Sequence, residues 1–298
     1  MNPREAGFLL LTSHLGNPDR RALTTAQLRN LGERMKAMTA PSEDRELELG
    51  DLVALGYGYD MAERILALLE EGELLGHYLR RAEKLGCMPV TRVSGQYPQI
   101  LKRRLGQTAP GCLWAKGDLS ILDTPMIALV GSRDLAHSNA QFAAEVGRQA
   151  ALQGFTLVSG NARGADRTAQ NACLKAGGTV VSIVADSLAQ KTLHQRILYI
   201  SEDDFDEEFS AQRALSRNRL IHALGEKTFV AQSSLQMGGT WDGTAKNLRF
   251  GWSPVFVCSD GSDASDALCQ MGANPVKREE LADFSALQEA EMNFLTAD

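Results

Sequence analysis

Three short segments combine glycine, hydroxyl and arginine residues in a way that suits the binding of an oxyanion. Each follows a short apolar run and precedes a stretch with helical spacing, so free backbone N–H groups and the positive end of a helix dipole would face a ligand. Glycine lets a phosphate approach the backbone, and the guanidinium groups of Arg133 and Arg163 match its oxygens as forks that lysine cannot copy. The segments are Gly131–Ser138, Ser159–Gly164 and Gln236–Thr244.

Each segment taken alone is explained as well by an ordinary glycine-bearing turn. The plain alternative for Arg133 or Arg163 is a surface ion pair with Asp134 or Asp166. Three such segments at one edge of a sheet, two of them with an arginine, favour instead a crevice lined for phosphate. We expect Asp166 to cap the following helix or to orient Arg163, rather than to touch phosphate.

Other kinds of site lack their sequence signatures. There is no G-x-G-x-x-G after the first apolar run and no G-x-x-x-x-G-K-[ST], so neither a dinucleotide cofactor nor a P-loop is indicated. His137 could hydrogen-bond a ligand, but the order of residues assembles no nucleophilic triad and no pair of catalytic carboxylates. The acidic run Glu202–Glu208 is interpreted as a solvated loop. We therefore expect no metal ion and no cofactor.

Short apolar or β-branched runs alternate with helical segments from Met126 onward. Such runs indicate a parallel sheet covered on both faces, which is a Rossmann-like, doubly wound, mainly parallel α/β fold. Ligands of such sheets bind beyond the carboxyl ends of the strands, where the three segments lie. The runs are Ile127–Val130, Phe155–Val158, Thr179–Val184, Thr228–Ala231 and Pro254–Cys258.

The helices between these runs have faces that suit a sheet. Small residues recur at helical spacing after the second segment and predict a helix that packs closely. They are Ala169, Ala172, Cys173 and Ala176, and residues 139–152 place Phe142, Ala143, Val146 and Ala150 on one face in the same way.

The chain is predicted to have two domains. Helical spacing in Thr24–Met35 and Met61–Leu79 indicates a small all-helical, SAM-like domain, with Ala40–Arg45 as a linker within it. We place the helical domain at residues 1–82, the Rossmann-like domain at residues 83–276, and a terminal helix and tail at residues 277–298.

The composition is that of an ordinary globular protein. Of 298 residues, 44% are hydrophobic and 23% are charged, and the formal net charge of −6 argues against a protein that coats nucleic acid by bulk electrostatics. Any nucleic-acid site must therefore be local. Five scattered cysteines are interpreted as reduced thiols. Without a signal peptide or an apolar run of about eighteen residues, we expect a cytoplasmic protein with no membrane association.

A series of further motifs runs from about Leu85 to Val276. They are Tyr97-Pro98 followed by Leu101, Pro110, Leu113-Trp114, Lys116-Gly117, Gly131-Ser-Arg133, Ser159-Gly160, Ala162-Arg-Gly164 with Asp166, Arg217-Asn-Arg219 and Gly272-Ala273. In order and spacing these motifs resemble the DprA/Smf family of DNA-processing proteins. The chain departs from the usual residues of that family at Asn161, Ala165, Gln170 and Gln232.

The resemblance implies a non-enzymatic protein that binds single-stranded DNA in a basic pocket, forms a homodimer, and hands the strand to a RecA-type recombinase during DNA uptake (transformation), processing or recombination. Because arginines two apart on a helix do not share a face, we expect one of Arg217 and Arg219 toward the crevice and the other toward solvent. Carried over by position, the pocket would use Ser132, Arg133, Ser159, Gly160, Arg163 and Gly164, with Arg217, Asn218 and Arg219 at its rim, and the third segment adds Gly238, Gly239 and Thr240.

The third segment also resembles the Gly-Gly-x-Gly-Thr turn of the related LOG and SLOG nucleotide-binding domains. Catalytic members of that group follow the turn with a glutamate, whereas Ala245 follows Thr244 in this chain. A nucleotide hydrolase, which would need Asp166, Asp242 or His137 as its acid or base, is therefore the less favoured alternative. A SLOG-type nucleotide sensor stays open beside the DNA-binding hypothesis.

Overall fold

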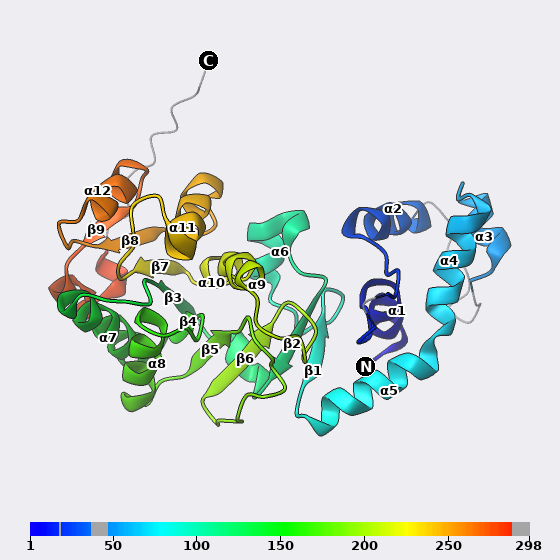
Figure 1. Cartoon of the computed structure of the whole chain (residues 1–298), viewed down its shortest axis with the longest axis horizontal. Coiled ribbons are helices and arrows are strands. Elements are labelled where there is room, and N and C mark those ends of the chain that lie inside the picture. The colour runs from blue at the N-terminus through cyan, green and yellow to red at the C-terminus, as the bar shows by residue number, and fades with distance from the viewer. Residues whose placement is uncertain (18, 37–46, 288–298) are drawn as a thin grey trace, which may run out of the picture.

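The computed structural model describes residues 1–17, 19–36 and 47–287 of the chain. Within these residues nine strands form one sheet with helices on both faces, and the N-terminal helices stand at the β1 end of the sheet (Figure 1). The predicted α/β, Rossmann-like fold is confirmed. The strands are β1 (Met88–Thr91), β2 (Cys112–Lys116), β3 (Met126–Val130), β4 (Thr156–Ser159), β5 (Val180–Ile183), β6 (Ile197–Ser201), β7 (Lys227–Val230), β8 (Val255–Cys258) and β9 (Asn274–Val276).

The strand order is β1-β2-β6-β5-β4-β3-β7-β8-β9. Neighbours from β6 to β9 are parallel, whereas β2 pairs antiparallel with both β1 and β6. The five predicted runs correspond to β3, β4, β5, β7 and β8, while β1, β2, β6 and β9 were not predicted. Strand β1 is an edge strand that contains Pro89, which is tolerated there because it need not donate to a ladder. Such a short, proline-containing strand has a weak hydrophobic pattern in the sequence, which explains why β1 was missed.

Alternating side chains of β3 divide the core of the sheet domain in two. Ile127 and Leu129 pack with helices α7 and α8, while Ala128 and Val130 pack with α6 and α10 on the other face. A strand buried on both faces needs the continuous apolar run that the sequence shows. These helices are α6 (Gln99–Leu105), α7 (His137–Leu152), α8 (Ala165–Lys175) and α10 (Asn218–Leu224), and α11 (Gly238–Phe250) and α12 (Asp263–Gln270) lie on the α6 side.

Close packing of α7 on α8 sets the position of the loop before α8. A Cβ at Gly147 of α7 would overlap the backbone of Ala169 in α8, so only glycine permits this approach. Ala169 and Cys173 are fully buried, as their helical spacing predicted. The start of α8 is thereby held against the carboxyl ends of β3 and β4.

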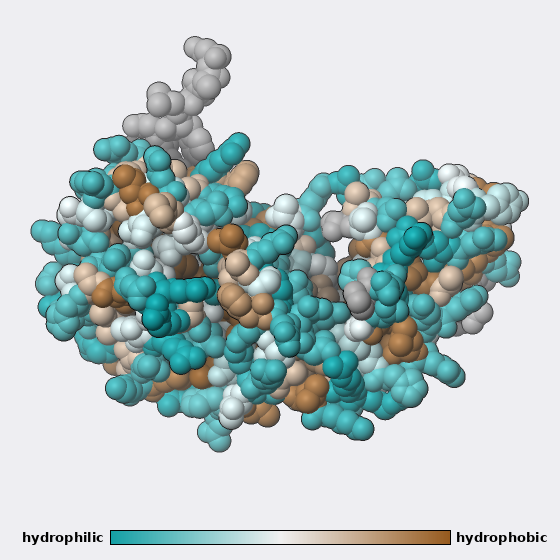
Figure 2. Space-filling view, in the orientation of Figure 1, coloured by the Kyte–Doolittle hydropathy of each residue, from teal (hydrophilic) through white to brown (hydrophobic). Residues whose placement is uncertain are grey.

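The described N-terminal helices form a lobe that packs against the sheet domain through aromatic side chains. Tyr78 packs on Phe205 and Trp114, with ring centroids 4.8 and 5.5 Å apart. Figure 2 shows the lobe beside the sheet domain, with a hollow between them. The predicted linker Ala40–Arg45 lies outside the described residues. The helices are α1 (Pro3–Thr12), α2 (Thr25–Lys36), α3 (Leu49–Ala54), α4 (Tyr59–Glu70) and α5 (Gly72–Lys84).

The terminal helix predicted after Val276 is not formed in the described part of that segment. Two 3-10 helices, η3 (Arg278–Ala282) and η4 (Phe284–Ala286), bring Leu281 and Phe284 into the core beside α7. The segment up to residue 287 therefore packs with the sheet domain, because these two apolar side chains lie in its core. No helix in the described ranges is long and apolar enough to cross a membrane.

Candidate anion-binding crevice

A cavity of about 380 Å³ opens beyond the carboxyl ends of β3 and β7. Its walls come from the loop after β3, the start of α8, and the helices α9 (Ala211–Ser216), α10 and α11. The three predicted segments meet at this place. Seven of the predicted site residues line the cavity: Ser132, Arg133, Arg217, Asn218, Gly238, Gly239 and Thr240.

Arg217 is buried in the crevice and does not stand at its rim as predicted. The residue is 6% exposed, and its Nε and Nη1 atoms have no hydrogen-bond partner in the described structure. Burial lowers the pKa of the guanidinium, while the nearby carboxylate of Asp166 raises it. A buried cation with unused donors is costly unless a ligand satisfies it. Arg217 therefore indicates a place for an anion.

Two features of the backbone make room for this arginine. Gly160, just after β4, passes so near the guanidinium that a Cβ would overlap Nη1 of Arg217. Arg217 itself forms the junction between α9 and α10. Because Leu220 and Ile221 anchor α10 in the core, the junction and its side chain are held at the crevice.

Asp166 is the buried acid beside Arg217. Its carboxylate accepts a hydrogen bond from the backbone N–H of Ala162 at 3.0 Å and so closes the loop that leads into α8. The predicted capping of α8 is wrong, because Gly164 is the N-cap residue and no side chain caps the described start of this helix. Burial raises the pKa of Asp166, whereas the charges of Arg217 and Arg133 lower it. The carboxylate thus partly balances the buried guanidinium without a direct ion pair among the described contacts.

Backbone hydrogen bonds join the crevice loops to one another. The N–H of Ser132 donates to the carbonyl of Gln232 at 2.9 Å, and the carbonyl of Ser132 accepts from the N–H of Ala165 at 3.1 Å. The side chain of Gln232 accepts a bond from the N–H of Ala136 at 2.8 Å. Gly164 has φ +84° and packs on the backbone of Ser132, where a Cβ would overlap. The crevice is therefore preorganised by contacts that its ligand need not make.

Four predicted pocket residues are not among those that line the crevice, contrary to the prediction: Ser159, Gly160, Arg163 and Gly164. Arg163 pairs with Asp134, Nη2 to Oδ1 at 3.0 Å, and its side chain is 73% exposed, so the plain alternative of a surface ion pair is what the structure shows. Ser159 is fully buried and accepts a hydrogen bond from Nε2 of Gln170 at 2.6 Å. The prediction that Asp166 orients Arg163 is also wrong, because Arg163 pairs with Asp134 while Asp166 accepts a hydrogen bond from Ala162.

The third predicted loop is mostly helix. Helix α11 begins at Gly238, so Gly239 and Thr240 lie in its first turn. The φ of +80° at Gly238 turns the chain into the helix without steric cost. Asn218 donates to the carbonyl of Gly239 at 3.0 Å and links α10 to this turn. Trp241, in the same turn of α11, is partly buried and packs against the core on the α6 side.

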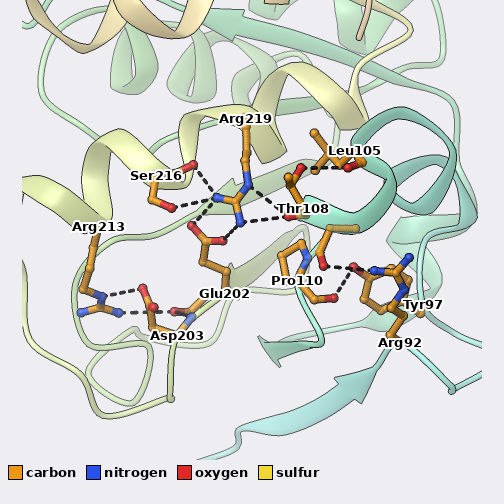
Figure 3. A network of polar contacts seen from close by, with 12 residues as sticks. Arg92, Tyr97, Leu105, Thr108, Pro110, Glu202, Asp203, Arg213, Ser216 and Arg219 are labelled. Atoms are coloured by element: carbon orange, nitrogen blue, oxygen red, sulfur yellow. Dashed lines mark hydrogen bonds and ion pairs between the residues drawn. The ribbon is translucent and has the colours of Figure 1, made fainter. Parts of the chain in front are cut away.

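Arg219 does not line the crevice. It is held in a polar network (Figure 3). Its Nη1 and Nη2 atoms contact the carboxylate of Glu202 at 2.9 and 2.5 Å, and Nη2 also donates to the carbonyl of Thr108. Arg213 donates from Nε to Asp203 at 2.6 Å. Of the two arginines, Arg217 is thus the one at the crevice, while Arg219 is held in an ion pair and does not stand at the rim as predicted. The solvated loop predicted for Glu202 is wrong, because its side chain is 7% exposed. The network ties α9 and α10 to the end of β6.

The acids and bases considered for hydrolysis are not gathered at the crevice. His137 begins α7 and contacts Gln141 at 2.9 Å, while Asp242 pairs with Lys246 at 2.8 Å. Of the three candidates only Asp166 lines the crevice. Within the described ranges, no group of three histidine, cysteine or acidic residues could hold a metal ion.

A mainly parallel sheet with a buried arginine at its carboxyl edge defines an α/β protein with a candidate anion-binding crevice. The model of the family named DNA recombination-mediator protein A matches residues 89–285, from β1 to η4. The chain belongs to this family, and the resemblance to DprA/Smf proteins drawn from its motifs is confirmed.

Solved structures of two relatives share the fold. DNA processing protein A from Streptococcus pneumoniae superposes with a TM-score of 0.70 at 23% identity, over 91% of this chain and 96% of that chain. A structure titled for the single-stranded DNA binding mode of DNA processing protein A from Helicobacter pylori superposes with a TM-score of 0.55 at 24% identity, over 66% and 94%.

Curated relatives match over shorter stretches. Protein Smf of Escherichia coli is 29% identical over 140 residues, which are 43% of this chain and 37% of the relative. DNA processing protein DprA of Streptococcus pneumoniae is 31% identical over 144 residues, or 44% and 49%. The matched regions thus span half or less of these two relatives.

Proposed function

We propose that the crevice binds the phosphate backbone of single-stranded DNA and that the protein acts in DNA processing as a binder, not as an enzyme. The observation that carries the proposal is the buried guanidinium of Arg217 with two unpartnered donor atoms. Phosphate oxygens accept hydrogen bonds in the geometry that a guanidinium offers. The Helicobacter pylori relative, whose title names single-stranded DNA binding, gives the same ligand class.

A local site suits the acidic chain. With a formal net charge of −6, attraction of DNA must come from a few cations placed where the dielectric constant is low. Arg133 and Arg217 both line the crevice, and the first turn of α11 adds backbone N–H groups that no helical carbonyl uses. Contacts of this kind recognise phosphate without reading sequence.

The polar groups of the crevice support binding without catalysis. Asp166 is the one acidic or histidine side chain among the described lining residues. Its carboxylate is committed to the N–H of Ala162 and to the field of two arginines, so it is poorly placed to accept a proton from a substrate. We therefore propose no catalytic residue.

The biological setting is part of the same proposal. Membership of the DprA/Smf family supports a homodimer that hands its strand to a RecA-type recombinase during DNA uptake or recombination. The proposal places this action in the cytoplasm, where chromosomal DNA and the recombinase meet.

Salt dependence tests the phosphate contacts. For a labelled oligothymidylate, the logarithm of affinity is expected to fall with the logarithm of salt concentration by about 0.7 per phosphate neutralised, for a few phosphates in all. Fluorescence anisotropy at about 50 and 200 mM salt measures the slope. Affinity that is independent of salt would contradict binding through phosphate.

Replacement of Arg133 and replacement of Arg163 are expected to differ in their effects on DNA affinity. Arg133→Ala is expected to weaken oligothymidylate binding about tenfold and to flatten the salt slope, because Arg133 lines the crevice. Arg163→Ala is expected to change affinity less than about threefold, because its exposed partner is Asp134. Equal losses in both variants would show that the strand covers the surface outside the crevice as well.

A small nucleotide is the second candidate ligand, favoured by the size of the crevice. A volume of about 380 Å³ is within the range of small-molecule pockets. A SLOG-type sensor would be stabilised against heat by a mononucleotide or cyclic nucleotide, as mass action requires, and would bind no oligonucleotide. A thermal-shift panel beside the anisotropy titration separates the two functions.

A further inference from the structure

A second cavity, of about 1070 Å³, adjoins the crevice. Its walls come from α6, η1 (Gly106–Thr108), α9, α10 and α11, with Trp252 just beyond α11. Leu215 and Gly238 line both cavities, so a ligand that passes over these two residues leaves one cavity and enters the other. The polar network around Arg219 forms part of the wall of this second cavity.

An exposed aromatic ring lies at the end of α11 in this second cavity. Phe250 is 59% exposed, and its ring stacks on that of Trp252 at 18° with centroids 5.7 Å apart. Trp252 is buried in the core on the α6 side and gives the exposed ring a rigid support. Gly251, with φ +63°, forms the turn that places the two rings together. A supported aromatic ring with an open surface suits the stacking of a planar ligand.

The charges around this ring favour a ligand that also carries phosphate. Arg104, Arg219 and Lys246 line the cavity. Arg219 is paired with Glu202 and Lys246 with Asp242, whereas Arg104 has no ion pair among the described contacts. The guanidinium of Arg249 lies 5.4 Å from the centroid of Phe250. An aromatic ring beside several cations is the combination that binds an unpaired nucleotide, whose base stacks while its phosphate attracts the cations.

We propose that the second cavity is a base-stacking subsite for the same DNA strand, in which an unpaired base stacks on Phe250 after the backbone has passed Arg217. This inference rests on the proposed function. It adds the path of the strand over the protein surface, which runs from the crevice past Leu215 and Gly238 to α11. Stacking of this kind tolerates any base, since every base has a planar face.

An abasic strand separates stacking from phosphate binding. Two labelled strands of about 12 nucleotides are compared, one an oligothymidylate and one with the same phosphates but with abasic sugars throughout. Phe250→Ala is expected to lower affinity for the oligothymidylate at least about fivefold and to leave affinity for the abasic strand unchanged. Phe250→Trp is expected to keep the affinity for both strands, because it keeps a stacking surface.

The control is Tyr59→Ala, which removes another exposed aromatic ring, on α4 in the N-terminal lobe, and is expected to change neither affinity. Equal weakening of both strands by Phe250→Ala, or no weakening of either, overturns the subsite. So does a change in oligomeric state of Phe250→Ala in sedimentation, since it would mean that another copy of the chain covers Phe250. If the wild-type protein binds neither strand, the proposed function itself fails.

Discussion

Replacing Arg217 with alanine is expected to lower the affinity for an oligothymidylate by at least about 30-fold. Removing one partner of a buried, hydrogen-bonded charge pair costs about 2–5 kcal/mol, and each 1.4 kcal/mol is about tenfold in affinity. Arg217 is buried, its Nε and Nη1 have no other described partner, and a bound phosphate would take both. Fluorescence anisotropy measures the loss, and circular dichroism confirms that the variant is folded.

Arg148→Ala is the matched control for this variant. Arg148 lies on α7, is paired with Glu145 at 2.6 Å and does not line the crevice, so its removal is expected to leave affinity within about twofold. Arg217→Lys is expected to recover only part of the affinity, because an ammonium keeps the charge but not the fork. A folded Arg217→Ala protein that binds as well as the wild type would remove the crevice as the DNA site.

Gly160→Ala is expected to lower affinity at least about tenfold although every charged residue stays in place. The new Cβ would overlap the guanidinium of Arg217, and the arginine must move out of the position in which it faces the crevice. Moving a donor out of reach forfeits its charge-assisted bonds, each worth about 1.5–3 kcal/mol. The thermal midpoint should also fall, because the displaced side chain is packed in a buried site.

The double variant Gly160→Ala/Arg217→Ala decides whether the glycine acts through the arginine. If it does, the two losses do not add, and the double variant binds as weakly as Arg217→Ala alone. Gly32→Ala, where a Cβ meets nothing within 4 Å, is the control and is expected to keep full affinity. Additive losses would instead mean that Gly160 contacts the ligand itself.

The sheet and the approximate place of the site could be predicted because both depend on local pattern. Apolar runs such as that of β3 must be continuous to be buried on both faces, and loops between strand and helix in such a sheet meet at one edge. Of the missed strands, β6 has an apolar run, Ile197–Ile200, that was not recognised, whereas β1 and β9 lack this signal. Strand β9 has three residues and β1 contains Pro89, so neither shows a run of its own.

The depth of Arg217 could not be predicted because it depends on contacts far apart in the sequence. Its burial needs Gly160 beside it and the break between α9 and α10, and helical spacing alone cannot reveal either. The same limit explains Arg163. The composition of its loop predicted a phosphate ligand, whereas in the folded protein Arg163 pairs with Asp134. Glu202 looked solvated for the same reason, since its partner Arg219 comes from α10.

Asn161 illustrates a departure from the family that the backbone explains. The residue has φ +59°, a left-handed conformation that asparagine adopts more readily than a larger apolar residue does. It stands between Gly160 and Ala162, whose N–H bonds to Asp166. A polar residue at this position therefore fits the tight turn between β4 and α8.

The most direct test of the proposed site is a structure of the protein with a bound oligothymidylate. We predict a phosphate oxygen within about 3.2 Å of Nε or Nη1 of Arg217, which are unpartnered without the strand. A strand bound elsewhere on the protein, with both atoms of Arg217 still unpartnered, would contradict the assignment of the crevice as the DNA site.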